Sequence, residues 1–159
     1  MQRDPANDIG AKEDLAAYTL RKASRRLKSA AKYYDDACKD KVDGDFDDSA
    51  NRSYYAAFFA ISALHVMDGK SFSRHGQAIG EFNKVYLKEK IFDRAYGEAL
   101  TNMMVYRHTG DYNAKVDVTR AQAKESLDMA TKIVKDIRGY FREKYPEVWE
   151  IYQKIYPST

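Results

Sequence analysis

The sequence predicts an all-α protein, folded as an antiparallel up-and-down bundle of four to five main helices with a short helix at the C-terminus. Three observations lead to this prediction. Apolar residues recur at helical spacing along most of the chain, no segment alternates apolar and polar residues as a strand would, and only three prolines and eight glycines interrupt 159 residues. Short loops between consecutive helices favour antiparallel neighbours.

The composition indicates one domain from a reducing compartment. A chain of 159 residues can bury roughly two thirds of its unfolded surface without disulfides or metal ions. Cys38 is the only cysteine, so neither an intrachain disulfide nor a CxxC metal site can form. The start, MQRDPANDIG, lacks a basic-then-apolar signal pattern, and no apolar stretch approaches the roughly 20 residues of a membrane span. We therefore expect a cytoplasmic protein without membrane contact.

The N-terminal part of the chain predicts a flexible segment and one long helix. Residues 1–11 show no apolar period and are expected to be flexible, ahead of a bundle over 12–145. The first helix is predicted over 12–39, with an inward stripe of Leu15, Tyr18, Leu27, Ala31, Tyr34 and Cys38.

The same helix carries a basic stripe. No acid stands between Leu15 and Tyr34, and four cations there share one helical face. This stripe either follows phosphate groups or is a solvated helix face. Its members are Arg21, Arg25, Lys28 and Lys32.

The aspartates in DKVDGDFDD (40–48) are predicted to cap the second helix, because acids favour the positive end of a helix. A calcium loop starting at Asp43 fits less well, since its sixth position lacks glycine and Tyr54 stands where a bidentate glutamate belongs. The second helix, over 46–68 with Gly69 as its stop, is apolar over most of its circumference. We therefore expect it to be the central helix.

Three further helices follow. Ser73 is expected to cap the third helix, and the fourth is expected to begin near Phe92 and to end at Gly110. Thr119 with Gln122 matches a capping box for a fifth helix that reaches about residue 145.

The last segment, 146–159, is predicted to be an aromatic helix or tail that begins at Pro146. Its Trp149, Tyr152 and Tyr156 share a face. This face either packs back on the bundle or contacts a dimer mate or another partner.

The stretch NMMVYRHTGDYN (102–113) concentrates polar side chains at the end of the fourth helix. Helical rotation puts Arg107 on the inward face with Tyr96 and Leu100, so its guanidinium needs a partner, and Asp111 lies four residues on. His108 is rotated by about 100° from Arg107, so the two side chains do not automatically converge. An imidazole base and an arginine beside a crowded phosphate suit RNA cleavage without a metal.

The other two histidines have different expected roles. His65, beside Leu64, is expected to be a packed, hydrogen-bonded core residue. His75, in SRHG, either caps the third helix locally or contacts a ligand. The sequence contains no HExxH, P-loop, GxGxxG or GxSxG motif. We therefore expect neither a metal nor a cofactor.

Three elements of the sequence together resemble the HEPN superfamily, the small helical domains named for higher-eukaryote and prokaryote nucleotide binding. They are ANRSYYAAFFAISALHVMDG (50–69), SRHGQAIGEFNK (73–84) and RHTGDY (107–112), and the likeness covers roughly residues 12–140. The branch that they resemble carries Arg-x-Tyr-Tyr on the second helix, His-Gly at the start of the third, and Arg-x3-Asp-Tyr at the end of the fourth.

The resemblance implies a helical bundle that forms a homodimer, with a composite cleft between the subunits. It also implies a metal-independent endoribonuclease that acts as a toxin beside a small nucleotidyltransferase antitoxin, or in antiviral defence. HEPN nucleases carry an Arg-x4–6-His motif, whereas the matching positions after Arg107 are Tyr112, Asn113 and Ala114. The arginine carries over and the histidine does not.

Two hypotheses follow. In the first, the protein is an RNA-directed effector in which Arg107 binds the scissile phosphate, and His108 of this or a partner subunit, or Tyr112, replaces the missing base. In the second, it is a non-catalytic module that binds a nucleotide or a protein, with Arg107 and Asp111 as a structural pair. Tyrosine is a poor base near neutral pH because its ordinary pKa is about 10. Arg52 is a further candidate, either for ligand binding or for anchoring the core.

Overall fold

The computed structural model describes residues 10–40 and 45–157, and the regular structure within these ranges is helical throughout. The predicted all-α fold is confirmed. Residues 1–9 of the predicted flexible N-terminus and residues 41–44 of the aspartate-rich loop lie outside the described residues. The elements are α1 (Ala11–Cys38), α2 (Phe46–Met67), α3 (His75–Phe82), the π-helical segment η1 (Asn83–Leu87), α4 (Ala95–Tyr112), α5 (Arg120–Lys144) and α6 (Pro146–Ile155).

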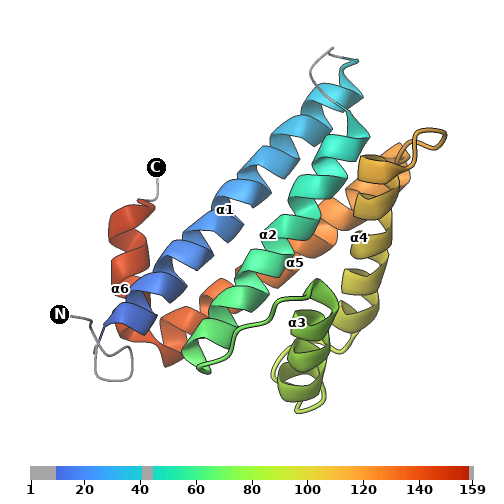
Figure 1. Ribbon diagram of the computed structural model, residues 1–159. Helices are drawn as coiled ribbons and strands as arrows, with labels where there is room; N and C mark the ends of the chain where they lie inside the picture. Colours follow the sequence, from blue (N-terminus) through green and yellow to red (C-terminus); the bar gives the residue numbers. More distant parts are fainter. Residues whose placement is uncertain (1–9, 41–44, 158–159) are drawn as a thin grey trace.

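The long helices α1, α2, α4 and α5 run alternately up and down (Figure 1). The central helix is α2, because it packs against α1, α3, α4 and α5. From the end of α5, α6 turns back along α1 and α5, on the side of the bundle away from α3 and α4 (Figure 1). The bundle therefore has two separate sides, one formed by α3 and α4 and the other by α6.

The inward face of α1 is built mainly from alanine. Leu20 is fully buried, whereas Leu15 and Tyr18 remain 56% and 48% exposed. The predicted inward stripe was therefore wrong at Leu15, Tyr18 and Ala31. Small side chains let two helix backbones approach closely, so burial here follows fit rather than the size of the apolar residue. The fully buried alanines are Ala16, Ala17, Ala23 and Ala30 on α1 and Ala50, Ala56, Ala57, Ala60 and Ala63 on α2.

Two predicted helix caps are present. The Asp45 side chain accepts a hydrogen bond of 2.7 Å from the backbone N–H of Asp48 at the start of α2. At the start of α5, the Thr119 hydroxyl accepts from the Gln122 N–H and the Gln122 side chain accepts from the Thr119 N–H, both at 3.1 Å. These caps satisfy N–H groups that have no partner inside their helices.

Other helix ends differ from the prediction by a few residues. Ser73 does not cap α3, because Arg74 is the residue before the helix and its side chain makes no capping hydrogen bond. The fourth helix begins at Ala95 rather than near Phe92, because η1 and the turns after it take up the chain up to residue 94. Gly69 follows α2 with φ +71°, a left-handed conformation that glycine adopts without strain.

The aromatic segment α6 packs back on the bundle, the first of the two alternatives for it. Val148 and Tyr152 are buried, and the Tyr152 hydroxyl lies 2.8 Å from the Ser24 hydroxyl on α1. Trp149 and Tyr156 stay partly exposed. The burial of Val148 and Tyr152 and the hydrogen bond to Ser24 therefore hold α6 against the bundle, while the rings of Trp149 and Tyr156 remain accessible.

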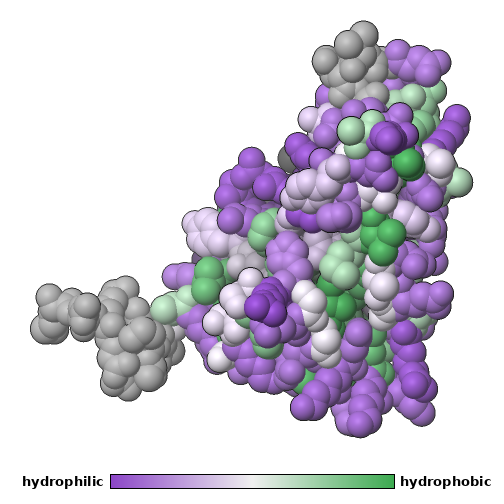
Figure 2. All heavy atoms as spheres, turned by 45° about the vertical axis from the view of Figure 1, so that its right-hand side comes forward, coloured by the Kyte–Doolittle hydropathy of each residue, from purple (hydrophilic) through white to green (hydrophobic). Residues whose placement is uncertain are grey.

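The surface of the bundle is mostly polar. Figure 2 shows a face that is largely hydrophilic, with hydrophobic residues in small patches. Tyr112 and Leu15 are the most exposed large hydrophobic residues that the structure describes, at 66% and 56%. None of the described helices combines the length and the apolar character that a membrane span requires.

Substitutions at Tyr152 should separate the packing of α6 from its hydrogen bond. Tyr152→Ala removes a buried ring and is expected to lower the free energy of unfolding by about 3 to 5 kcal/mol. Tyr152→Phe removes only the hydroxyl and leaves Ser24 unpaired, so we expect a loss of about 1 kcal/mol. Urea unfolding followed by circular dichroism measures both, with the exposed Gln153→Ala as the control. A Tyr152→Ala protein as stable as the control would show that α6 does not stabilise the bundle.

Candidate functional site

The Arg107 side chain of α4 lies against two tyrosines of the central helix. Its Nη2 donates a hydrogen bond of 2.6 Å to the Tyr55 hydroxyl. Its guanidinium carbon lies 5.3 Å from the Tyr55 ring centre, 5.8 Å from that of Tyr54 and 5.5 Å from that of Tyr112. Its Nε lies 3.1 Å from Asp111 Oδ2, an ion pair in which the N–H is not aligned with the oxygen. The guanidinium is therefore fixed by three aromatic rings and one carboxylate.

Arg107 remains accessible and charged. Its side chain is 18% exposed, and Nη1 makes no hydrogen bond to any described residue. Burial opposes the charge, but the hydrogen bond to Tyr55 and the Asp111 carboxylate outweigh it, so the pKa of Arg107 lies above the ordinary arginine value. At least one nitrogen of the cation can therefore donate to a ligand.

A chain of polar contacts connects Arg107 to Arg52. Asn51 Nδ2 donates to Asp111 Oδ2 at 2.9 Å, and Asn51 Oδ1 accepts from Arg52 Nη1 at 3.0 Å. Arg52 also lies 3.9 Å from Asp48 and packs its guanidinium carbon 5.3 Å from the Tyr33 ring centre. The structure thus brings the candidate residues Arg52, Asp111 and Arg107 together through Asn51, which the sequence did not single out.

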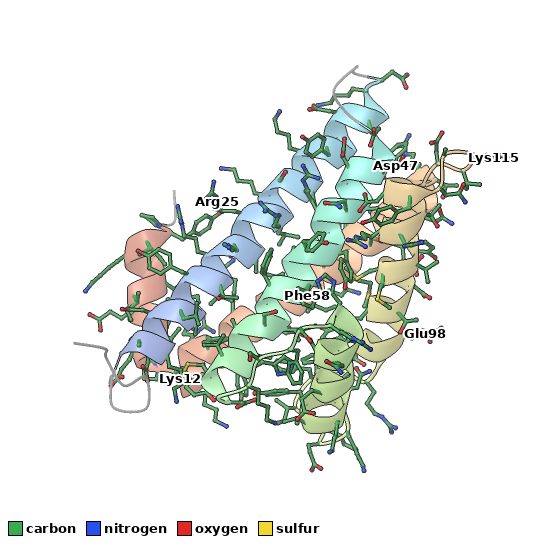
Figure 3. All side chains as sticks on the ribbon, in the orientation of Figure 1. Lys12, Arg25, Asp47, Phe58, Glu98 and Lys115 are labelled. Carbon is green, nitrogen blue, oxygen red and sulfur yellow. The ribbon has the colours of Figure 1, made fainter. Side chains whose placement is uncertain are left out.

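His75, at the start of α3, faces α2. Its Nδ1 lies 3.0 Å from the Tyr54 hydroxyl, and its ring centre lies 4.1 Å from that of Phe58, which projects from α2 beside α3 (Figure 3). Burial, together with the positive charge of Arg107, lowers the pKa of His75 below its ordinary value. Burial also raises the pKa of Tyr54 to about 12. The imidazole and the phenol are therefore both neutral near pH 7.

The position of the ring proton decides what His75 can do. If Tyr54 donates to Nδ1, the proton sits on Nε2 and the ring offers a donor. If Nδ1 donates instead, Nε2 is a free base, but the buried Tyr54 hydroxyl loses its acceptor, because no other described residue bonds to it. An unsatisfied buried hydroxyl costs about 1 to 3 kcal/mol. The donor arrangement is favoured, so His75 is better suited to bind an anion than to take a proton.

His108 and Tyr112 lie at the exposed edge of the site. The rings of the two residues are 5.0 Å apart, and Tyr112 is 66% exposed. Tyr112 contacts the Arg107 guanidinium, and His108 contacts the Tyr112 ring. His65 is buried with Nε2 2.8 Å from the Ala78 carbonyl oxygen, so its predicted packing role is confirmed.

Gly110 lies inside α4, which continues to Tyr112, so the predicted stop at Gly110 was wrong. A Cβ added at Gly110 would lie 3.1 Å from Asp47 Cβ and 3.2 Å from Asp47 Cα. Asp47, at the start of α2 beside the end of α4 (Figure 3), also accepts a hydrogen bond of 2.7 Å from the Val118 N–H. The missing side chain lets the two helices meet, and it thereby brings Asp111 within reach of Asn51.

A groove of about 320 Å³ adjoins Tyr55 between α1 and α2. Its aromatic wall is Phe59, whose ring centre lies 5.5 Å from Lys22 Nζ and 5.9 Å from the Arg26 guanidinium carbon. The surface next to Arg107 is therefore both aromatic and basic. The lining residues are Arg26, Asn51, Arg52, Tyr55 and Phe59.

The family of the chain follows from its similarity to known proteins. A family model described as the HEPN domain matches residues 18–140. This chain belongs to the HEPN family. A UPF0332 protein of Thermotoga maritima is 31% identical over 97 residues, which cover 57% of this chain and 74% of that protein. A protein of Methanocaldococcus jannaschii named as a candidate toxin is 23% identical over 99 residues, which cover 62% of this chain and 67% of that protein.

The arrangement of the site differs from the spacing expected of HEPN nucleases. Within α4, no histidine follows Arg107 at the expected distance. The imidazole that contacts the same two tyrosines as Arg107 is His75, which comes from α3. Within the two described ranges, no three His, Cys, Asp or Glu side chains gather closely enough to hold a metal ion. At this site the HEPN bundle thus brings together an arginine, a neutral imidazole and the side chains of three tyrosines.

Gly110→Ala should disturb the contact between the end of α4 and the start of α2. We expect a loss of stability of about 1 to 3 kcal/mol, because the new methyl group meets backbone and must displace it. Gly139→Ala is the matched control, since a Cβ there meets nothing within 4 Å and a helical alanine is favoured by about 0.5 to 1 kcal/mol. Thermal unfolding compares the two. An equally stabilising Gly110→Ala would show that the contact at Asp47 does not constrain α4.

Stability should fall as the pH drops below about 6.5, the ordinary histidine value. Burial lowers the pKa of His65, and burial with Arg107 lowers that of His75. Below pH 6.5 the unfolded chain therefore binds protons that the folded chain binds only at lower pH, which favours unfolding. Urea unfolding between pH 7.5 and 5.5 measures this loss. His75→Asn should make it smaller, and an unchanged pH dependence would exclude a lowered pKa at His75.

Proposed function

We propose that this HEPN protein acts on RNA as a toxin-type or defence effector, and that Arg107 binds a phosphate of that RNA. The guanidinium of Arg107 supports this most directly. The side chain is 18% exposed and contacts Tyr55 and Asp111, and its Nη1 makes no hydrogen bond to a described residue. A planar guanidinium held in place offers directional donors to a phosphate. The HEPN match and the relative named as a candidate toxin support the same class of function.

Cleavage without a metal would proceed by attack of a 2′-hydroxyl on the adjacent phosphorus. The P–O bond to the 5′-oxygen breaks, the departing oxygen takes up a proton from water or from the protonated base, and a 2′,3′-cyclic phosphate and a 5′-hydroxyl form. Arg107 would stabilise the negative charge on the crowded phosphate. A base must take the proton of the 2′-hydroxyl, and the candidates are His108 and Tyr112 at the end of α4.

A second candidate function is a module that binds RNA or a nucleotide without cutting it. The hydrogen bond between Tyr54 and His75 favours this function, because it leaves the neutral imidazole with a donor at Nε2 rather than a free base. The pairing of Arg107 with Asp111 also fits a binding role. Arg52 and Asn51 would extend such a binding site along α2.

The proposal includes a homodimer in which the end of α4 faces a second copy. Val105, Tyr112 and Val116 are 54%, 66% and 49% exposed on and after this helix, and a second copy would cover them. It would also bring a second Arg107 toward the same crevice. For a toxin of this family, we expect a small nucleotidyltransferase as the antitoxin partner, and the free thiol of Cys38 accords with a cytoplasmic location.

Incubation of the pure protein with end-labelled single-stranded RNA in EDTA separates the two functions. An effector cleaves the RNA, and Arg107→Ala lowers the rate by about 100-fold or more. His108→Ala and Tyr112→Phe then identify the base, and His75→Ala tests whether the imidazole on α3 contributes to RNA binding. A module leaves the RNA intact, and Arg107→Ala weakens its binding to a short oligonucleotide by about 1.5 to 3 kcal/mol, the range for a hydrogen bond to a charged group.

Two further variants keep this test decisive. Arg94→Ala is the matched control, because Arg94 is exposed at the start of α4. Arg107→Lys keeps the charge without the planar fork, so it replaces Arg107→Ala if that protein does not fold. If the RNA stays intact, and the wild-type protein and a folded Arg107 variant bind it equally well, both functions are contradicted.

A further inference from the structure

A second basic surface flanks α6, on the side of the bundle away from α3 and α4 (Figure 1). A groove of about 540 Å³ lies between α1 and α6 and is lined by Arg21, Arg25, Lys28 and Lys32 together with Tyr156. A second groove, of about 400 Å³, lies between α5 and α6 and is lined by Lys135, Arg138 and Arg142 together with Trp149, Gly139 and Asp136, whose carboxylate accepts a hydrogen bond from Tyr96. We call these seven cations and two rings the α6 surface.

The cations from α1 form one row. Residues 21, 25, 28 and 32 fall within an arc of about 60° and extend over roughly 16 Å of helix. Figure 3 shows Arg25 pointing away from α2. Lys22 and Arg26 are rotated onto the other flank of α1, where they contact Phe59 of α2. The row is therefore separate from the basic groove beside Arg107.

Few of these charges are compensated. Within the described residues, Arg21, Arg25 and Lys28 form no ion pair, and neither do Lys135 and Arg138. Lys32 lies 3.6 Å from Asp36, and Arg142 lies 3.9 Å from Glu143; both cations are exposed, so these ion pairs are weak. Uncompensated cations in concave surfaces attract anions from solution.

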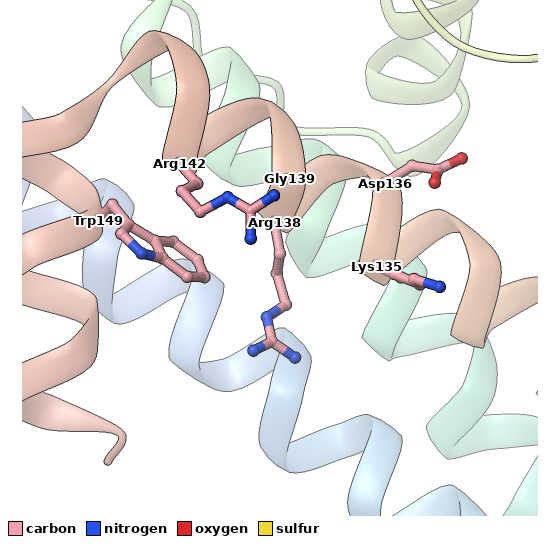
Figure 4. A pocket seen from close by; sticks show the side chains of 6 residues that line it. All are labelled: Lys135, Asp136, Arg138, Gly139, Arg142 and Trp149. Carbon is pink, nitrogen blue, oxygen red and sulfur yellow. The ribbon is translucent and has the colours of Figure 1, made fainter. Parts of the chain in front are cut away.

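A row of aromatic rings joins the two grooves. Ring centres are 5.0 Å apart between Trp149 and Tyr152 and 5.8 Å apart between Tyr152 and Tyr156. The guanidinium carbon of Arg138 lies 5.9 Å from the Trp149 ring centre, and its Nε is buried without a hydrogen-bond partner among described residues. Figure 4 shows Trp149 of α6 facing Arg138 and Arg142 of α5. Cations therefore flank the aromatic row on both sides.

We propose that the α6 surface binds single-stranded RNA, with phosphates on its cations and bases against Trp149 and Tyr156. A basic groove that follows the backbone, combined with rings that stack on bases, is the chemistry by which proteins hold single strands. The partly buried rings leave little apolar area for insertion into a lipid bilayer. This inference rests on the proposed action on RNA, but it concerns a site that does not include Arg107.

Binding of a 20-nucleotide 2′-O-methyl RNA with a fluorescent label tests the surface. The methyl group blocks the 2′-hydroxyl, so the probe stays intact whether or not the protein is a nuclease. We expect Arg25→Gln with Lys28→Gln and Lys32→Gln to weaken binding by about tenfold or more at low salt. The slope of the logarithm of the binding constant against the logarithm of the salt concentration should become shallower by about 2, because each of the three lost phosphate contacts contributes roughly 0.7.

The matched control neutralises an equal number of exposed cations on the other side of the bundle. Lys84→Gln with Lys88→Gln and Arg94→Gln removes the same total charge, from one arginine and two lysines, around η1 and the start of α4. This protein should bind the probe as wild type does. Equal losses of affinity in the two triple variants would show that net charge alone explains the effect and would overturn the proposal.

Trp149 reports on the site directly, because it is the only tryptophan in the chain. RNA stacked beside it should quench its emission at the same concentrations that raise the anisotropy of the probe. Arg107→Ala should keep this quenching even if it abolishes cleavage, so loss of catalysis alone would leave the α6 surface intact. Tight binding without a change at Trp149, or binding to anionic vesicles but not to RNA, would overturn the proposal.

Discussion

The contact between Arg107 and the two tyrosines of α2 determines the geometry of the whole site. An arginine on an inward helix face needs a hydrogen-bond acceptor and a counter-charge, which the Tyr55 hydroxyl at 2.6 Å and the Asp111 carboxylate at 3.1 Å supply. Asp111 follows Arg107 within α4, but Tyr55 is in reach only because α4 packs closely on α2, as the contact of Gly110 with Asp47 shows. The polar site and the packing of the bundle are therefore one constraint.

The same positive charge shapes the chemistry of its neighbour. Burial and Arg107 both lower the pKa of His75, and the Tyr54 hydroxyl occupies its Nδ1. An imidazole in this state donates one hydrogen bond without bringing a second positive charge into the site. Arg107 thus supplies a positive charge and His75 a directed hydrogen-bond donor. This combination is better suited to binding a phosphate than to transferring a proton.

Local features of the fold followed from the sequence, and features that depend on distant contacts did not. The caps at Asp45 and Thr119 use residues three apart, so their spacing is visible in the chain. The inward face of α1 depends on which neighbour allows a close approach, and apolar residues at helical spacing pointed to Leu15 and Tyr18 instead of the fully buried alanines. Hydrophobic size predicts burial poorly wherever two helices pack through small residues.

The candidate site shows the same limit. The ion pair of Arg107 with Asp111 lies four residues apart on one helix and was expected, whereas the hydrogen bond to Tyr55 spans 52 residues and needs the tertiary fold. Asn51 was missed because an asparagine beside a candidate arginine carries no signal of its own. Its role appears only once the start of α2 lies against the end of α4, where its amide joins Asp111 to Arg52.

The two sides of the bundle carry positive charge in different ways, and this difference has a physical consequence. Arg107 and Arg52 are paired with carboxylates, Asp111 at 3.1 Å and Asp48 at 3.9 Å, so their field is short-ranged and directional. Around α6 most cations lack such partners, so their field extends over about a Debye length, roughly 8 Å at physiological ionic strength. An anionic strand would therefore be attracted mainly by the α6 surface and oriented mainly by Arg107. Salt should weaken the first effect far more than the second, because screening acts on exposed charges and little on a hydrogen-bonded guanidinium held against aromatic rings.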